Sequence, residues 1–256
     1  MDTFGIEKIC CGALAMLIAL STTAIAATND DARVKPMPDA LEIRFALSAL
    51  PPALRDDATV YVLDPAQGYR VARKGASGVE CLVERTPWEM GELRDDVYVP
   101  LCYDAAGAST LLKVKRDAAE LRVHGMSGAA LKAEIEKRWK DGTYHAPGKA
   151  GLSYMVAPLM RAVGPPDLHV HTMTMPHLMF YAPGLTNADI GAKPNLADPE
   201  SLMSPFVDRQ GNDAQSYIIQ MIGEAEKAKI VSTQQDLLRD LCAHETVLCL
   251  DHATHH

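Results

Sequence analysis

Hydrophobic and polar residues alternate with different periods along the chain, and these periods predict an α+β fold. Residues 40–49 fit a short helix that ends before two prolines. Residues 58–63, 69–73 and 79–84 are short, rich in β-branched and aromatic side chains, and separated by glycine-containing turns. Three such strands in succession favour an antiparallel meander.

The period becomes helical over residues 110–140, where apolar residues recur every three or four positions. Gly125 and Gly128 divide this stretch into two helices, and Ser127 is suited to cap the second. The loop before this pair contains Trp88, which we expect to pack back on the sheet. A helical pair is therefore expected after the early strands.

Strand patterns return after residue 150 in segments bounded by prolines, which places these segments at edges or strand ends. These segments are residues 151–157, 168–175 and 177–181. Two further strand segments, residues 204–208 and 215–222, flank a polar turn and predict a β-hairpin. Residues 224–243 fit a C-terminal helix.

These elements predict a single α+β domain over residues 40–222. Its antiparallel sheet combines the early meander with the later strands, and a helical pair is inserted between them. Residues 223–256 are expected to form the C-terminal helix and a frayed tail that contains three histidines.

The first residues resemble an export signal. Lys8 precedes an apolar run, and Ala24-Ile25-Ala26 has the small-x-small pattern of a cleavage site. We therefore assign residues 1–26 to a signal peptide and residues 27–39 to a linker. An uncleaved amphiphilic anchor is the alternative. The protein is expected to be periplasmic or secreted.

The net charge of the chain limits the kinds of partner that we expect it to bind. Removal of Asp2, Glu7 and Lys8, which together carry a charge of −1, changes the formal charge from −8 to −7. An acidic chain is disfavoured as a partner of nucleic acid or of an anionic membrane surface. No segment after the signal is apolar enough to span a membrane. The expected partner is a small ligand or another protein.

Four cysteines follow the signal, and an even number in an exported chain predicts disulfides. Cys81 and Cys102 are the favoured pair because both lie in strand-like segments. Cys242 and Cys249 can pair only if the helix ends between them, since a continuous helix would separate them by about 10 Å.

Chemistry-bearing residues concentrate between residues 169 and 191. His169 and His171 would share one face of a strand, and His177 could add a third imidazole. Imidazoles with neighbouring thioethers suit copper, whereas three imidazoles and a water suit zinc. The alternative is a surface strand with solvated histidines and no cofactor.

His177 is also a candidate general base, with Tyr181 as a hydroxyl donor on the same face of the strand. A triad with Ser153 and Asp189 is conceivable, because residues 151–153 carry half of a nucleophile elbow. The competing interpretations are that His177 is a buried structural histidine and that Asp189 stabilises a turn.

One segment resembles a family of uncharacterised exported bacterial proteins. It reads Pro-His-Leu-Met-Phe-Tyr-Ala-Pro from residue 176, followed by Thr-Asn-Ala-Asp-Ile-Gly from residue 186. The resemblance implies a coherent domain over about residues 45–222 in an exported protein, and it transfers no activity.

We expect a non-enzymatic protein that binds a small ligand or a partner. The alternatives are a hydrolase centred on His177 and a copper- or zinc-binding protein.

Overall fold

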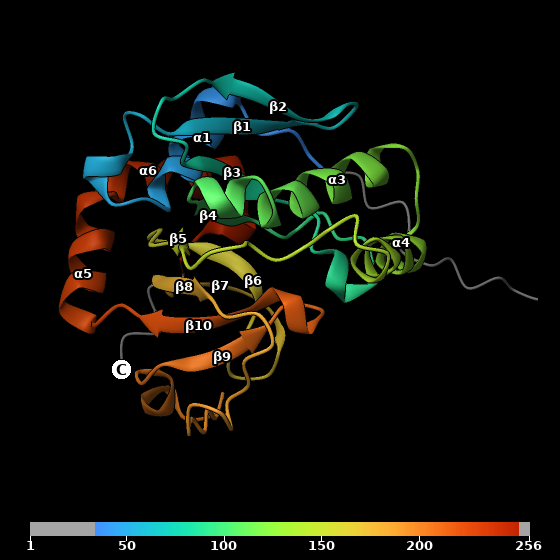
Figure 1. The fold of residues 1–256 in the computed structure, drawn as a ribbon. Coiled ribbons are helices and arrows are strands. Elements are labelled where there is room, and N and C mark those ends of the chain that lie inside the picture. Colours follow the sequence, from blue (N-terminus) through green and yellow to red (C-terminus); the bar gives the residue numbers. More distant parts are fainter. Residues whose placement is uncertain (1–33, 251–256) are drawn as a thin grey trace, which may run out of the picture.

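Eight strands form one mostly antiparallel sheet in the computed structural model, which describes residues 34–250. The strand order β2-β1-β3-β4-β5-β8-β10-β9 can be followed from top to bottom in Figure 1. β6 and β7 form a separate antiparallel hairpin. The strands are β1 (Thr59–Asp64), β2 (Gly68–Arg73), β3 (Glu80–Glu84), β4 (Val99–Tyr103), β5 (Leu152–Met155), β6 (Met160–Gly164), β7 (His169–Met173), β8 (His177–Tyr181), β9 (Phe206–Arg209) and β10 (Ser216–Met221). The expected α+β class is confirmed.

The expected helical pair follows β4. Ser127 caps its second helix, where its Oγ accepts a hydrogen bond from the Ala130 amide. The predicted C-terminal helix is instead two helices, because Gln234 leaves helical geometry at φ −121° and ψ 25°. The α-helices are α1 (Asp39–Ser48), α2 (Ala105–Ala108), α3 (Leu111–Val123), α4 (Gly128–Lys140), α5 (Glu224–Thr233) and α6 (Gln235–His244). Trp88 is buried, but it packs in a cluster with residues of α3 and α4.

The first three strands do not form the expected meander. β1 and β2 form an antiparallel hairpin, but β3 pairs with β1 in parallel, with Thr59 beside Glu80. The chain leaves β2 near the start of β1 and crosses to the other side of that strand. Gly75 permits this crossing, because a Cβ atom there would lie 2.0 Å from the carbonyl oxygen of Asp57. The sequence predicts the three short strands, but the parallel pairing of β1 with β3 depends on the close approach of the backbone at Gly75.

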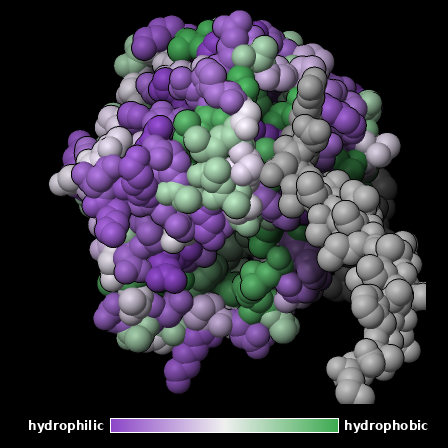
Figure 2. All heavy atoms as spheres, turned by 90° about the vertical axis from the view of Figure 1, so that its right-hand side faces the viewer, coloured by the Kyte–Doolittle hydropathy of each residue, from purple (hydrophilic) through white to green (hydrophobic). Residues whose placement is uncertain are grey.

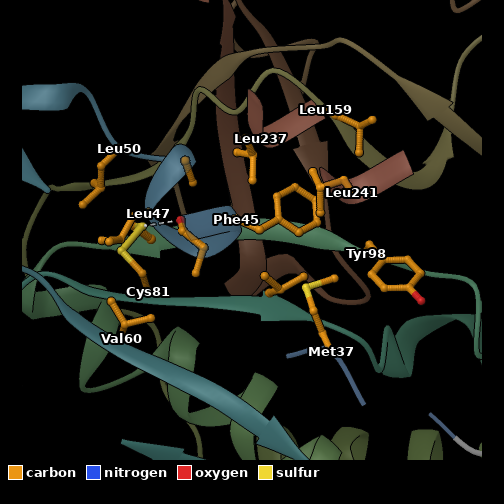
Figure 3. Close-up of a cluster of buried hydrophobic side chains, with 14 of the residues drawn as sticks. Met37, Phe45, Leu47, Leu50, Val60, Cys81, Tyr98, Leu159, Leu237 and Leu241 are labelled. Atoms are coloured by element: carbon orange, nitrogen blue, oxygen red, sulfur yellow. Dashed lines mark hydrogen bonds between the residues drawn. A yellow bond between two sulfur atoms is a disulfide. The ribbon is translucent and has the colours of Figure 1, made fainter. Parts of the chain in front are cut away.

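One face of the sheet packs against α1 and α6. Figure 3 shows Phe45 of α1 together with Leu237 and Leu241 of α6, over the strand that carries Cys81. Phe45 and Leu241 are fully buried. The beginning and the end of the described chain therefore share one hydrophobic core.

The opposite face of the sheet packs against α2, α3 and the β6–β7 hairpin. β6 was not expected as a strand. The segment predicted at residues 168–175 appears as β7, His169–Met173. None of the helices within residues 34–250 has the length and apolar character needed to cross a bilayer. The predicted signal peptide, part of the linker and the end of the tail lie outside the described residues.

Candidate functional site: a methionine-lined cavity

A cavity of about 480 Å³ lies between this second sheet face and the β6–β7 hairpin. Its sheet wall comes from alternate residues of six strands, because successive side chains of a strand point to opposite faces. One residue from each strand illustrates the wall: Glu84, Leu101, Met155, Met179, Phe206 and Ile219. Ala162 and Gly164 of β6 form part of the other side. Figure 2 shows hydrophobic residues around a hollow in the lower half of the molecule.

Methionine is the most characteristic residue of the cavity wall. Five methionines line it: Met90, Met155, Met160, Met175 and Met179. Unbranched thioether side chains are flexible and polarizable, so a wall built from them can adapt to occupants of different shapes. The cavity therefore combines an apolar surface with adjustable packing.

His177 is the histidine of this wall and is only 4% exposed. Its Nδ1 lies 2.7 Å from the carbonyl oxygen of Met175. A carbonyl only accepts, so Nδ1 carries the proton and donates, which leaves Nε2 as an acceptor. Burial lowers the pKa of His177. The imidazole is thus neutral, and within residues 34–250 its Nε2 has no hydrogen-bond partner.

A buried ion-pair cluster borders the cavity. Lys115 of α3 is 1% exposed, and its Nζ lies 2.9 Å from Oε1 of Glu84 and 3.5 Å from Oε1 of Glu89. Burial raises the pKa of Glu84 to about 7, against the opposing effect of Lys115. Burial alone would lower the pKa of Lys115, but the attraction of Glu84 and then Glu89 outweighs it and raises that pKa.

Asp208 adds a third carboxyl group to the cavity wall. Asp208 is exposed to solvent on β9. Even so, the protein around its carboxyl group raises the pKa of that group by desolvation. Glu84 and Glu89 pair with the buried ammonium group of Lys115, and Asp208 interacts with that group at longer range. When all are ionised, this cluster carries an excess of negative charge, and it favours occupants with a positive charge or a hydrogen-bond donor.

The structure does not bring Ser153, Asp189 and His177 together. Ser153 is fully buried on β5, and its Oγ has no hydrogen-bond partner within residues 34–250. It lies opposite Met179 instead of His177. Asp189 accepts hydrogen bonds from the amide and hydroxyl of Thr186, which hold its pKa below the usual value. Asp189 therefore serves a turn, as the competing interpretation expected.

Tyr181 shares a face of β8 with His177 but has a structural role. Its hydroxyl lies 2.8 Å from the carbonyl oxygen of Leu152 and 3.1 Å from Oδ1 of Asp104. Burial, followed by the charge of Asp104, raises the pKa of Tyr181. A Cβ at Gly107 would lie 2.1 Å from this hydroxyl. The tyrosine is tied to the start of α2 and does not act with His177.

His169, His171 and His177 do not form the expected metal shell. His169 is exposed on β7. The Nε2 of His171 lies 2.6 Å from Oδ1 of Asp167. Across residues 34–250, no three His, Cys, Asp or Glu side chains are grouped closely enough to hold a metal ion. Two of the three histidines are thus surface residues of a hairpin.

The favoured pair, Cys81 and Cys102, is confirmed, and the pair that the sequence left open, Cys242 and Cys249, also forms a disulfide. Cys81 and Cys102 lie directly opposite each other on β3 and β4, with their Cα atoms 4.1 Å apart. Cys242 and Cys249 pair across 4.4 Å, because α6 ends at His244 and the chain turns back. The geometric condition set by the sequence is therefore met.

Comparisons with protein-family models, curated proteins and solved structures find no match for this chain. The resemblance to uncharacterised exported proteins stays a prediction.

Sequence reasoning missed the acidic side of the cavity. Lys115 offered a signal, because it lies four residues after Leu111 and three before Ala118, within the apolar stripe of α3. A cation in such a position needs a buried partner. The identity of the partners, Glu84 and Glu89, depends on contacts between distant segments.

Proposed function

We propose that this protein binds an apolar small molecule in the methionine-lined cavity. The observation that carries the proposal is the cavity of about 480 Å³ behind the β6–β7 hairpin. Small-molecule sites have volumes of about 300–1,000 Å³, mostly apolar walls and a few polar groups that orient the ligand. His177 and the acidic cluster supply such groups at this wall.

The ligand has an apolar body and a polar group that donates hydrogen bonds. The Nε2 atom of His177 accepts, and the carboxyl groups of Glu84, Glu89 and Asp208 accept as well. A carboxylate or phosphate group on the ligand would meet repulsion at this cluster. Neutral alcohols, amides and amines with an apolar body are the favoured chemical class.

We also propose that this binding takes place outside the cytoplasm, in the periplasm or the secreted fraction. The two disulfides support this setting, since structural disulfides persist mainly in oxidising compartments. A hydrolytic reaction at His177 is not favoured, because the hydroxyl of Ser153 makes no hydrogen bond to that imidazole.

Titration with a neutral fluorescent naphthylamine, N-phenyl-1-naphthylamine, tests the proposal. The full chain should bind the probe saturably, with increased emission on transfer from water to the cavity. Ala162→Phe places a ring into the cavity from β6 and should weaken binding at least tenfold.

Ala129→Phe is the matched control, because Ala129 is exposed on α4 and lies away from the cavity. It should bind the probe like the unmodified chain. Far-UV circular dichroism and urea midpoints establish that both variants are folded. Non-saturable emission, or equal binding by the two variants, would contradict the proposal.

A further inference from the structure

Methionines are concentrated around His177 to a degree that apolar packing does not require. The second core cluster contains six of the twelve methionines of the sequence. They are Met155, Met160, Met173, Met175, Met179 and Met221. Leucine, isoleucine or valine would fill a core with better-defined rotamers. A thioether differs from these side chains in one chemical respect, its soft sulfur donor.

Strand register places three of these methionines next to His177. Met155 of β5 and Met221 of β10 lie directly opposite His177 on its two sides. Side chains opposite each other in antiparallel strands have Cβ atoms about 4.5–5.5 Å apart and share a sheet face. Met179 is two residues along β8, on the same face. Three methionines therefore flank His177 on one face of the sheet.

The imidazole is oriented as a ligand. Its Nδ1 is held by the carbonyl oxygen of Met175, so the lone pair of Nε2 is the free donor. A backbone carbonyl on the second ring nitrogen is one of the ways in which proteins fix a metal-binding histidine. His177, Met155 and Met179 line the cavity, which gives an ion a route to the site.

We propose that Nε2 of His177 and the sulfurs of Met155, Met179 and Met221 form a binding site for copper(I). Thioethers select this soft monovalent ion, and an imidazole completes a neutral four-donor set. Zinc would prefer thiolate or more imidazole ligands, and the four cysteines of residues 34–250 are all in disulfides. The acidic residues of the same cavity offset the charge of the bound ion.

Anaerobic titration of the full, untagged chain with copper(I), in competition with a chromogenic copper(I) chelator, tests the site. One ion should bind per chain. Replacement of His177 by glutamine, or of Met155 and Met179 by leucine, should weaken binding at least tenfold, because changes even in a supporting shell cost about 10–100-fold. Leucine conserves volume, so these variants should fold.

Two controls make the result specific. Met90→Leu removes a thioether that lines the cavity outside the proposed site, and it should leave the affinity unchanged. A triple alanine variant of His252, His255 and His256 removes the imidazoles of the tail and should also bind one ion. Binding that is lost in either control, or retained when His177 is replaced, would overturn the site.

Methyl NMR of ¹³C-methionine with silver(I), a redox-stable probe of the same coordination preference, provides the second readout. The methyl signals of Met155, Met179 and Met221 should shift, while that of Met203 should not. Shifts spread over all methionines, or none, would contradict the proposal. Binding of the naphthylamine is measured separately, so the metal site and the apolar ligand site can fail independently.

Discussion

Glu42 offers a sharp test of the energetics of the core. This residue of α1 is 3% exposed, and its Oε1 accepts a hydrogen bond from the Leu63 amide at 2.9 Å. Burial raises its pKa from 4.5 to about 7, more than the hydrogen bond lowers it. The folded protein therefore binds a proton more tightly here than the unfolded chain does.

The direction of the pH effect follows from this raised pKa. The carboxyl group contributes its full stability below about pH 4.5, and this contribution is lost as pH rises through about 7. The pKa of Glu42 is about 2.5 units higher in the folded protein than in the unfolded chain, and this difference corresponds to about 3 kcal/mol of unfolding free energy. Replacement of Glu42 by glutamine keeps the acceptor for the Leu63 amide and removes the titrating group.

The expected result is that the Glu42→Gln variant gains about 3 kcal/mol relative to the unmodified chain between pH 4.5 and pH 8. Urea unfolding followed by the fluorescence of Trp88 and Trp139 at a series of pH values measures this difference. Glu136→Gln, exposed on α4, is the control and should show no such trend. A difference that is the same at both pH values would refute the reasoning.

Two further changes test the stability of the structure. Lys115→Met leaves Glu84 buried without its counter-charge and should destabilise the protein by about 3–5 kcal/mol in urea unfolding. Adding Glu84→Leu to this variant removes the unpaired carboxyl group and should restore part of the lost stability. If the double variant is less stable than Lys115→Met alone, the loss is not caused by the unpaired charge of Glu84. Replacement of Cys81 and Cys102 by serine opens a loop with a sequence separation of 21 and should cost about 3 kcal/mol. An unchanged urea midpoint would show that the bond contributes little.

Local patterns predicted the elements of this fold well. The helix at α1, the two helices on either side of Ser127 and the hairpin of β9 and β10 follow from side-chain period, capping and turn chemistry. These signals act within a few residues, so the sequence displays them directly. The disulfide between Cys242 and Cys249 was left open until the end of α6 was known.

The site was predicted only in part, because it depends on long-range register. His177 was singled out, and it lies in the cavity wall. The expected partners were those near it in sequence, such as His171 and Tyr181, whereas the observed neighbours are Met155 and Met221 on other strands. The parallel pairing of β1 with β3 was missed for the same reason. Spacing along a strand identifies a face but not what lies opposite.

The shared core of α1 and α6 has a consequence for biosynthesis. Phe45 is made early, but Leu237, Leu241 and Leu248, which complete its surroundings, are added some 190 residues later. A nascent chain emerging from the ribosome cannot bury that aromatic ring in its native surroundings until α6 has been made. Termination of translation before α6 would therefore leave Phe45 without part of its native cover.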